Sequence, residues 1–433
     1  MYRHIMLGLL LATSMGIPHI QAQEKKPELT LQILFKKVEA ANPGLKSKRT
    51  AVKSANAKRQ QAGVLPNPEV ELESENILGS GETEGFDSAE TTLKLSEKIE
   101  WGGKRKARQD AADLKYHYAS LEYELAKQTL FLTAFDSYIT VISQEQRVAI
   151  AEEQKTLHQQ FVKTVSKQVQ SGRLPKAELT RAEILLINAS LAIEKSEHEY
   201  KESLSWLSML WNKTGHIQGL GVESLPIPSH NLEELRAHAE DVVEHNMGRK
   251  LIVNQRDQAK QHIALEKSLS SQDPVLSGGV KRNNGSSTTS FVAGIGFPLA
   301  IFDQNKGNIK AAKFQSEEWE HRLTVYENEL SINYEHTFHH AQLLQNEATV
   351  LKNKVLPKSK SVYQQIQQGY LQGKYAYLDV INAQKEWVEV QEQLITVLGD
   401  YWKTIAQLEL ILGHGLDHQL PDLFLQTKET SYE

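Results

Sequence analysis

The chain has 433 residues, with 49 Lys and Arg against 54 Asp and Glu, a formal charge of −5, 40% hydrophobic residues and no cysteine. This charge supplies no basic field for a phosphate backbone, so the composition argues against a nucleic-acid-binding protein, and the apolar content is sufficient to fill a core. The lack of cysteine excludes disulfides, thiolate metal sites, thiol catalysis and a lipid-modified cysteine.

The first 22 residues have the layout of a secretory signal peptide. Arg3 and His4 precede an apolar run at residues 5–17, and Ala22 is a small residue at a plausible cleavage point. Removal of this segment takes away one arginine and leaves 48 basic against 54 acidic residues, a net charge of −6. No later stretch of 18 apolar residues occurs, so the mature chain is expected either to be soluble outside the cytoplasm or to span a membrane as β-strands.

Most of the chain is predicted to form unusually long helices. Residues 104–170 contain no proline, and their apolar residues recur mostly at steps of three, four, seven or eight, which places them on one helix face. A continuous helix of this length extends about 100 Å. Similar runs cover residues 175–211, 307–368 and 377–412. Such long periodic runs are typical of coiled coils or helical tubes.

The two halves of the chain repeat one another. Residues 170–183 align with residues 371–384, with glycine on glycine and base on base, and Asn42 aligns with Asn246. Two copies of one unit of about 200 residues therefore make up the chain. The predicted organisation is a signal peptide at 1–22, a first repeat at 23–230, a second repeat at 231–412 and a C-terminal tail at 413–433.

Each repeat also contains a predicted pair of β-strands. Alternating segments occur at residues 67–78 and 89–99 in the first repeat and at 275–281 and 289–297 in the second. Strands of about ten residues suit a membrane β-segment. Because four strands cannot close a barrel, sister copies would have to supply the rest, and three copies would give twelve strands.

The order of these motifs resembles that of TolC-like outer-membrane efflux proteins. Residues 29–45 and Leu65-Pro66-Asn67-Pro68 are similar to the first helix and first strand of that family, and residues 99–105 and 297–307 resemble its strand-to-helix passages. Within the family, the chain is most similar to the cobalt–zinc–cadmium (CzcC-like) branch, which serves heavy-metal pumps of the resistance-nodulation-division (RND) class. The likeness runs from about residue 28 to residue 412.

The resemblance implies a fold class that is mainly α with a small β part. It implies a homotrimer in which a long coiled-coil α-helical barrel crosses the periplasm and a transmembrane β-barrel is completed by trimerisation, with four strands from each chain. The expected role is a passive exit duct in the outer membrane of a Gram-negative cell, with outer-membrane lipid, a periplasmic adaptor (membrane fusion) protein and an inner-membrane RND pump as partners. Several relatives carry an acylated N-terminal cysteine, and this chain has no cysteine to acylate.

Two Gly-containing breaks between the long helices are the sharpest candidate sites. A glycine there lets the chain reverse and exposes a polar tip. In the family such tips form the periplasmic entrance and dock on the adaptor, although turn chemistry alone would also explain the glycines. The candidate residues are Gly172, Arg173, Leu174, Gly373, Lys374 and Tyr375.

Four alternating glutamates, Glu69, Glu71, Glu73 and Glu75, would line the lumen if the intervening apolar residues face lipid. Three copies would then form carboxylate rings that favour cations, or simply a solvated face. His336 and His340 lie one helical turn apart, a geometry able to bind a divalent metal, but no carboxylate motif completes a site. We therefore predict no metal site, cofactor or nucleic-acid partner.

Hydrolytic motifs and a phosphate-binding loop are also absent from the sequence, so we do not expect an enzyme. The main interpretation is the outer-membrane channel of a tripartite efflux system for heavy-metal cations. Two alternatives remain open on the sequence: a duct for drug efflux or type I protein secretion, and a secreted coiled-coil interaction protein.

Overall fold

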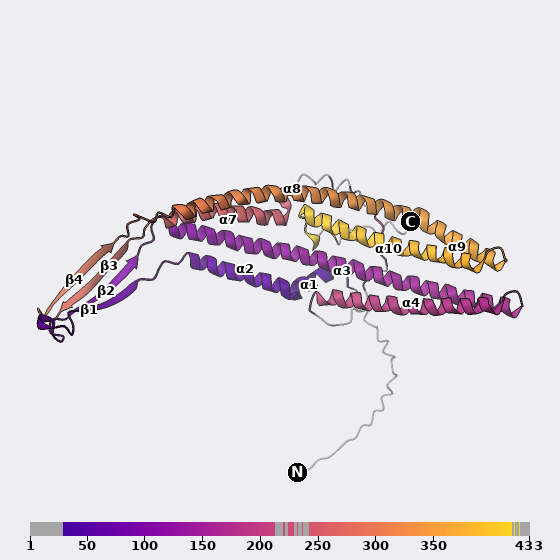
Figure 1. Ribbon diagram of the computed structural model, residues 1–433, viewed down its shortest axis with the longest axis horizontal. Coiled ribbons are helices and arrows are strands. Elements are labelled where there is room, and N and C mark those ends of the chain that lie inside the picture. The colour runs from indigo at the N-terminus through magenta and orange to yellow at the C-terminus, as the bar shows by residue number, and fades with distance from the viewer. Residues whose placement is uncertain are drawn as a thin grey trace, which may run out of the picture.

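The computed structural model describes residues 29–212 and 242–417, together with positions 220, 224–228, 232, 236, 420 and 424. The predicted signal peptide and the predicted boundary at residues 230 and 231 lie outside the described residues. The described part of the chain is elongated: a four-stranded sheet occupies one end, and long helices run from it to two hairpin tips at the other (Figure 1).

The first repeat contains one helix that extends over most of the helical part. This helix, α3, spans Lys104–Gln170, the range that the apolar period predicted, and its 67 residues extend about 100 Å. Three shorter helices accompany it: α1 (Leu31–Ala41), α2 (Pro43–Ala62) and α4 (Lys176–Met209).

The second repeat has the same plan but a broken long helix. The helix α8 (Lys306–Val350) continues through a π-helical segment, Leu351–Val355, into α9 (Leu356–Leu371). The sequence predicted one continuous helix here. Pro357 explains the break, because proline lacks the N–H that an α-helix uses four residues back and its ring clashes with that carbonyl. The remaining helices are α6 (Val242–His245), α7 (Met247–Leu269) and α10 (Tyr377–Leu412).

The four strands form one antiparallel sheet in the order β1-β2-β3-β4. They are β1 (Glu69–Glu75), β2 (Glu90–Lys98), β3 (Val275–Asn283) and β4 (Thr288–Gly296). The register aligns Leu72 with Leu93, Leu93 with Val280 and Val280 with Phe291, so side chains of one kind fall on one face. This face is apolar and exposed, and it carries Val70, Leu72, Leu93, Leu95, Leu276, Val280, Phe291 and Ile295.

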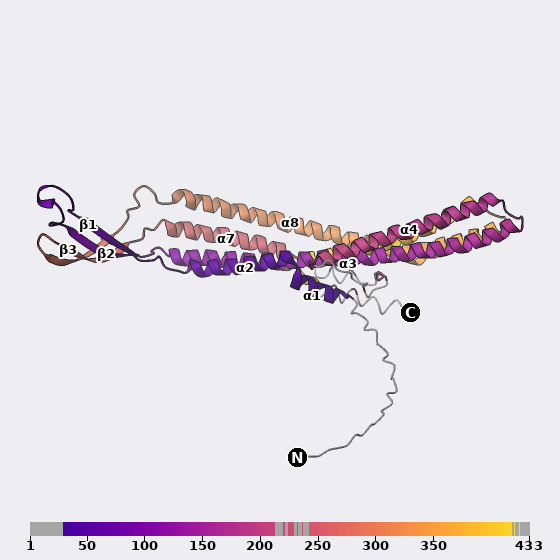
Figure 2. The ribbon, with the colours of Figure 1, turned by 90° about the horizontal axis from the view of Figure 1, so that it is seen from below.

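The helices lie side by side in a curved layer. The long helix α3 contacts α2, α4, α7 and α10. The helices α7 and α10 in turn contact α8. The helices α2 and α4 therefore form one edge of the layer, and α8 and α9 form the other (Figure 1). Figure 2 shows α7 and α8 displaced to one side of α2 and α3, which is the curvature of the layer. Among the described residues, none of the helices has the length and apolar content needed to cross a membrane.

Two apolar clusters hold the helices together. The larger one joins α1, α3, α8 and α10 about fully buried residues such as Phe135, Phe338 and Trp402. The smaller one, nearer the tips, joins α3, α4, α9 and α10 around Phe161, Tyr363 and Trp387.

Two asparagines at equivalent positions of the two repeats form the same hydrogen bonds. Asn42 caps α2 by accepting from the Leu45 N–H, and its amide donates to the carbonyl of Leu210 at the end of α4. Asn246 caps α7 in the same way, and its amide donates to the carbonyl of Ile411 near the end of α10. Each asparagine therefore joins the start of one helix to the end of another: Asn42 joins α2 to α4, and Asn246 joins α7 to α10.

We predict that Asn246→Ala destabilises the protein more than Asn42→Ala. Both changes remove a cap and an amide bond, and Asn246 also accepts a 3.0 Å bond from the Tyr326 hydroxyl. We expect losses of roughly 2–4 kcal/mol for Asn246→Ala and roughly 1–3 kcal/mol for Asn42→Ala, measured by denaturant unfolding in detergent. Equal losses would show that the Tyr326 bond adds no stability.

Candidate functional site

The two predicted tips have the same backbone geometry. Gly172 and Gly373 have φ values of +73° and +76°, in the left-handed region that glycine tolerates. At the first tip, the N–H of Gly172 donates to Val169 O and that of Arg173 donates to Gln168 O, at 3.0 and 2.9 Å. At the second tip, Gly373 and Lys374 repeat these bonds to Tyr370 O and Gly369 O. Both helices thus end in the paired bonds of a Schellman motif.

The structure brings both tips to one end of the molecule, far from the sheet (Figure 1). Arg173 and Lys374 are exposed there, whereas Leu174 packs partly against the smaller apolar cluster. Tyr375 lies over Gly369, where a β-carbon would come within 2.4 Å of its ring. The structure therefore has two exposed chain reversals at the positions that the sequence predicted.

Behind the tips lies an aromatic cluster that the sequence analysis did not single out. Tyr377 stacks on Phe161 with ring centroids 6.1 Å apart, and Tyr370 lies beside both of these rings. The hydroxyls of Tyr370 and Tyr377 and one carboxylate oxygen of Glu178 are buried without a hydrogen-bond partner. Burial and the nearby Glu178 carboxylate raise the pKa of Tyr377 to about 12. This region therefore holds polar groups that the present arrangement leaves unsatisfied.

Three polar side chains lie between α3 and α10 next to the smaller apolar cluster. Gln384 on α10 donates to Gln154 at 2.5 Å and lies 3.1 Å from the Nε2 atom of His158, both on α3. Burial lowers the pKa of His158. The π-helical segment Leu351–Val355 lies beside the larger cluster, because Leu351 is a member of it and Val355 packs against it. Leu356, the first residue of α9, packs against both clusters.

The four glutamates of β1 lie on the polar face of the sheet, opposite Val70 and Leu72. Glu71 pairs with Lys94 at 2.5 Å, and Glu75 lies 3.5 Å from Lys281, which pairs more closely with Glu90 of β2. Glu69 and Glu73 form no salt bridge within the described residues. The polar face is therefore partly neutralised, which the alternation in β1 alone does not reveal.

His336 and His340 stack on one another with ring centroids 6.4 Å apart. Within the described ranges, no group of three or more His, Asp or Glu side chains is arranged to hold a metal ion.

Asp273 forms the joint between sheet and helices. Its carboxylate, 6% exposed, accepts from Lys104 at 2.7 Å and from the backbone N–H of Trp101 at 2.9 Å, and it pairs with Lys98. Burial by itself raises the pKa of Asp273, but the bonds from Lys104 and Trp101 outweigh it and hold the pKa below its ordinary value. The passage from β2 to α3 is thus tied to the chain just before β3.

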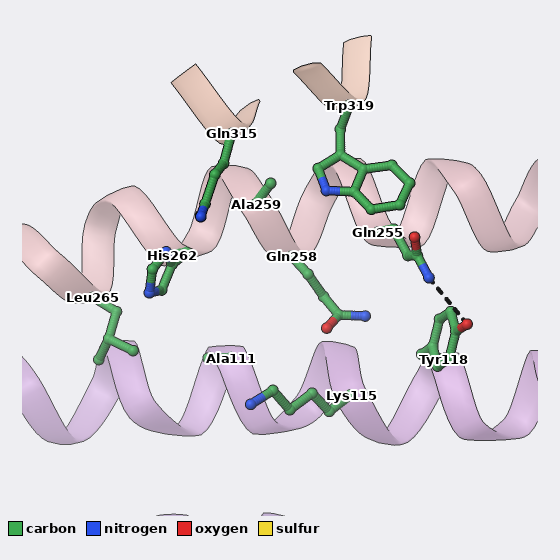
Figure 3. Close-up of a pocket in the computed structure, with 10 residues that line it drawn as sticks. All are labelled: Ala111, Lys115, Tyr118, Gln255, Gln258, Ala259, His262, Leu265, Gln315 and Trp319. Atoms are coloured by element: carbon green, nitrogen blue, oxygen red, sulfur yellow. Dashed lines mark hydrogen bonds between the residues drawn. The ribbon is translucent and has the colours of Figure 1, made fainter. Parts of the chain in front are cut away.

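An open trough of about 370 Å³ lies between α3, α7 and α8 (Figure 3). Its lining is mostly amide and aromatic, and the Gln255 side chain donates to the Tyr118 hydroxyl across it at 3.0 Å. The trough combines residues of both repeats, which is why no single sequence motif predicted it.

Other site residues were also beyond the sequence reasoning. Glu178 aligns with Asp379 in the repeat, but its place among buried tyrosines depends on the packing of α3, α4, α9 and α10. One signal in the sequence could have indicated the aromatic cluster, because the two repeats differ there. Tyr370 and Tyr377 stand where the first repeat has Val169 and Lys176.

The family follows from comparison with known proteins. The model of the outer membrane efflux protein family matches residues 34–213 and 243–414, and the chain belongs to this family. It is an outer-membrane efflux channel protein with a helical periplasmic part.

Among curated relatives, the chain is 25% identical to the cobalt-zinc-cadmium resistance protein CzcC of Cupriavidus metallidurans, over 90% of this chain and 91% of that protein. It is 23% identical to the nickel-cobalt-cadmium resistance protein NccC of Alcaligenes xylosoxydans, over 70% of this chain and 67% of that protein.

Solved structures share the fold. CusC matches with a TM-score of 0.74 and 17% identity over 89% of this chain and 92% of its own. The open state of the MtrE channel of Neisseria gonorrhoeae matches with a TM-score of 0.69 and 15% identity over 89% of each chain. The sequence-based predictions of fold class, family, channel function and outer-membrane location are confirmed.

The unsatisfied hydroxyl behind the tip gives a matched pair of variants. Tyr377→Phe removes a buried hydroxyl without a partner, whereas Tyr363→Phe removes one that accepts a 3.0 Å bond from Gln367. We expect Tyr377→Phe to be neutral or to stabilise by up to about 1 kcal/mol and Tyr363→Phe to destabilise by about 1 kcal/mol, measured by thermal unfolding. A similar loss in both variants would contradict the unpaired state of the Tyr377 hydroxyl.

Proposed function

We propose that three copies of this chain form a passive exit duct for heavy-metal cations, fed by an inner-membrane RND pump through a periplasmic adaptor protein. The proposal rests on two edges, one at each side of the described part of the chain, that have no partner within it. The sheet ends at β1 and β4, and the helical layer ends at α2 and α4 on one side and at α8 and α9 on the other.

Ring closure would satisfy the edges of the sheet. The strands alternate in direction, so β4 of one copy can pair with β1 of the next and keep the antiparallel order. The exposed apolar face would then meet lipid and the charged face would line a water-filled lumen, which is the arrangement of a transmembrane β-barrel. Three copies would supply twelve strands.

Apolar stripes on the helical edges support the same ring. On α4, exposed Ile184, Ile187 and Leu191 follow helical spacing on the face opposite buried Ala182 and Ala189. On α8, the exposed stripe also lies opposite the buried face, and its residues are spaced by eleven and seven: Phe314, Val325, Ile332, Leu343 and Val350. Each such aliphatic side chain gains roughly 1.5–3 kcal/mol when fully buried, so the two edges favour packing on sister copies.

The tips supply the proposed entrance. Their exposed Arg173 and Lys374 are suited to charge-dependent docking of the adaptor, and the unsatisfied Glu178, Tyr370 and Tyr377 groups would gain hydrogen bonds in a rearranged, open tip. The glutamates of β1 would add a modest preference for cations in the barrel, because Lys94 and Lys281 already neutralise part of their charge.

The relatives support the cargo. Proteins named for cobalt-zinc-cadmium and nickel-cobalt-cadmium resistance match over most of this chain. A duct of this kind conducts and performs no covalent chemistry, so the proposal includes no catalytic residue or cofactor.

Deletion of the gene tests the cargo. We expect the deletion strain to become sensitive to cobalt, zinc, cadmium or nickel, with unchanged tolerance of hydrophobic drugs and unchanged protein secretion, because the pump that feeds the duct selects metal ions. The measurement is the minimal inhibitory concentration of each compound, with a complemented strain as control. Sensitivity to drugs alone, or loss of a secreted protein alone, would replace the metal proposal by the corresponding alternative.

Charge reversal at the tips tests docking. We expect the double variant Arg173→Glu, Lys374→Glu to lose most of the metal tolerance while remaining in the outer membrane, because it changes the adaptor contact and not the fold. The matched control is Lys201→Glu, Lys385→Glu, which reverses two exposed lysines of α4 and α10 away from the tips. Equal loss of tolerance in both pairs would remove the support for a docking role of the tips.

A further inference from the structure

We propose that the passage between β4 and α8, residues 297–305, is a membrane-interface anchor that inserts its apolar side chains into the inner leaflet of the outer membrane. Phe302 is 98% exposed, Leu299 is 74% exposed, and Ile301 and Phe297 are also exposed. Four large apolar side chains within six residues of a connecting segment are unusual on a surface that meets only water. This inference rests on the proposed position of the sheet in the bilayer.

The passage is built to display these side chains. Asn305, held at a φ of +58°, donates from its side-chain amide to both the backbone carbonyl and the carboxylate of Glu266 on α7, at 2.8 and 2.7 Å. The Asp303 carboxylate accepts from the Asn305 N–H at 2.8 Å, and the N–H of Ile301 donates to Leu299 O at 2.9 Å. The base of the passage is therefore fixed to α7 while Ile301 and Phe302 project from it.

The apolar face of the sheet continues directly into this passage. On β4, alternate residues Phe291 and Ile295 lie on the apolar face, and the last paired residue of the strand is Gly296, opposite Val275. Phe297 follows at once. Trp101, 62% exposed, lies at the same end of the sheet, where its N–H is bonded to Asp273. Aromatic side chains just beyond an apolar band are typical of a membrane–water interface.

The charge distribution favours a lipid surface as the occupant. Lys306, Lys310 and Lys313 are exposed and follow Phe302 within the first three turns of α8. Basic side chains directly behind inserted aromatic residues are placed to meet phosphate headgroups. The chain has no cysteine for acylation, so an apolar passage of this kind would supply an attachment to the leaflet that does not depend on a covalent lipid.

The lack of cysteine also makes the test clean, since a single introduced thiol can be labelled with the environment-sensitive fluorophore NBD. Four variants are needed: Phe302→Cys and Leu299→Cys in the passage, Phe291→Cys on the apolar face of β4, and Lys195→Cys on α4. Each full-length labelled protein is reconstituted into phosphatidylethanolamine–phosphatidylglycerol vesicles that contain phospholipid spin-labelled near the top of the acyl chain.

We expect the quenching of NBD at positions 302 and 299 to reach at least roughly half of that at position 291. It should also be at least about threefold stronger than the quenching at position 195. Quenching at 291 with none at 302 and 299 would overturn the anchor while the sheet remains in the bilayer. Protection of 302 from aqueous iodide without lipid quenching would show that a second copy of the chain covers the passage, which also overturns it. Absence of quenching at 291 would refute the membrane position of the sheet itself.

Discussion

Unpaired backbone groups at the two edges of the sheet are the constraint on which the rest of this molecule depends. Among the residues that the structure describes, β1 and β4 each leave one side without a partner strand, and the same sheet carries an exposed apolar face. In lipid, each unsatisfied N–H or C=O group costs several kcal/mol, so a single copy cannot place this sheet in a membrane. Sister strands remove the cost, and the helical edges, which carry exposed apolar stripes, are set to associate in the same ring.

The two repeats share a plan and differ in the long rod and the tip. Asn42 and Asn246 form equivalent joints, and both tips end in the same pair of backbone bonds. The second repeat, however, has the π-helical segment Leu351–Val355 in its long rod, whereas α3 is unbroken. Its tip also carries the tyrosines with unsatisfied hydroxyls. Buried polar atoms without a hydrogen-bond partner also occur on α3 and α4 of the first repeat, so the π-helical segment is the feature that distinguishes the second hairpin from the first.

Much of this architecture could be predicted from the sequence because its determinants are local and periodic. The apolar period gave α3 its correct ends, the alternation gave four strands, and the glycines marked both reversals. Features that depend on contacts between distant segments could not be predicted in this way. The lysines that neutralise Glu71 and Glu75 come from β2 and β3, and the partners of Glu178 come from other helices. Pro357 was a local signal for the π-helical segment, but the apolar spacing continues through this proline and predicts an unbroken helix.

Closure of the sheet into a ring can be tested by counting the chains in the assembly. Native mass spectrometry of the protein, released in detergent from the outer-membrane fraction, measures the mass of the intact assembly. The account predicts a single species of three chains, because only a closed ring pairs β1 with β4 and buries the apolar stripes of α4 and α8. A monomer that stays soluble after detergent is removed would contradict the account, since its sheet edges and apolar face would then need neither lipid nor a sister chain.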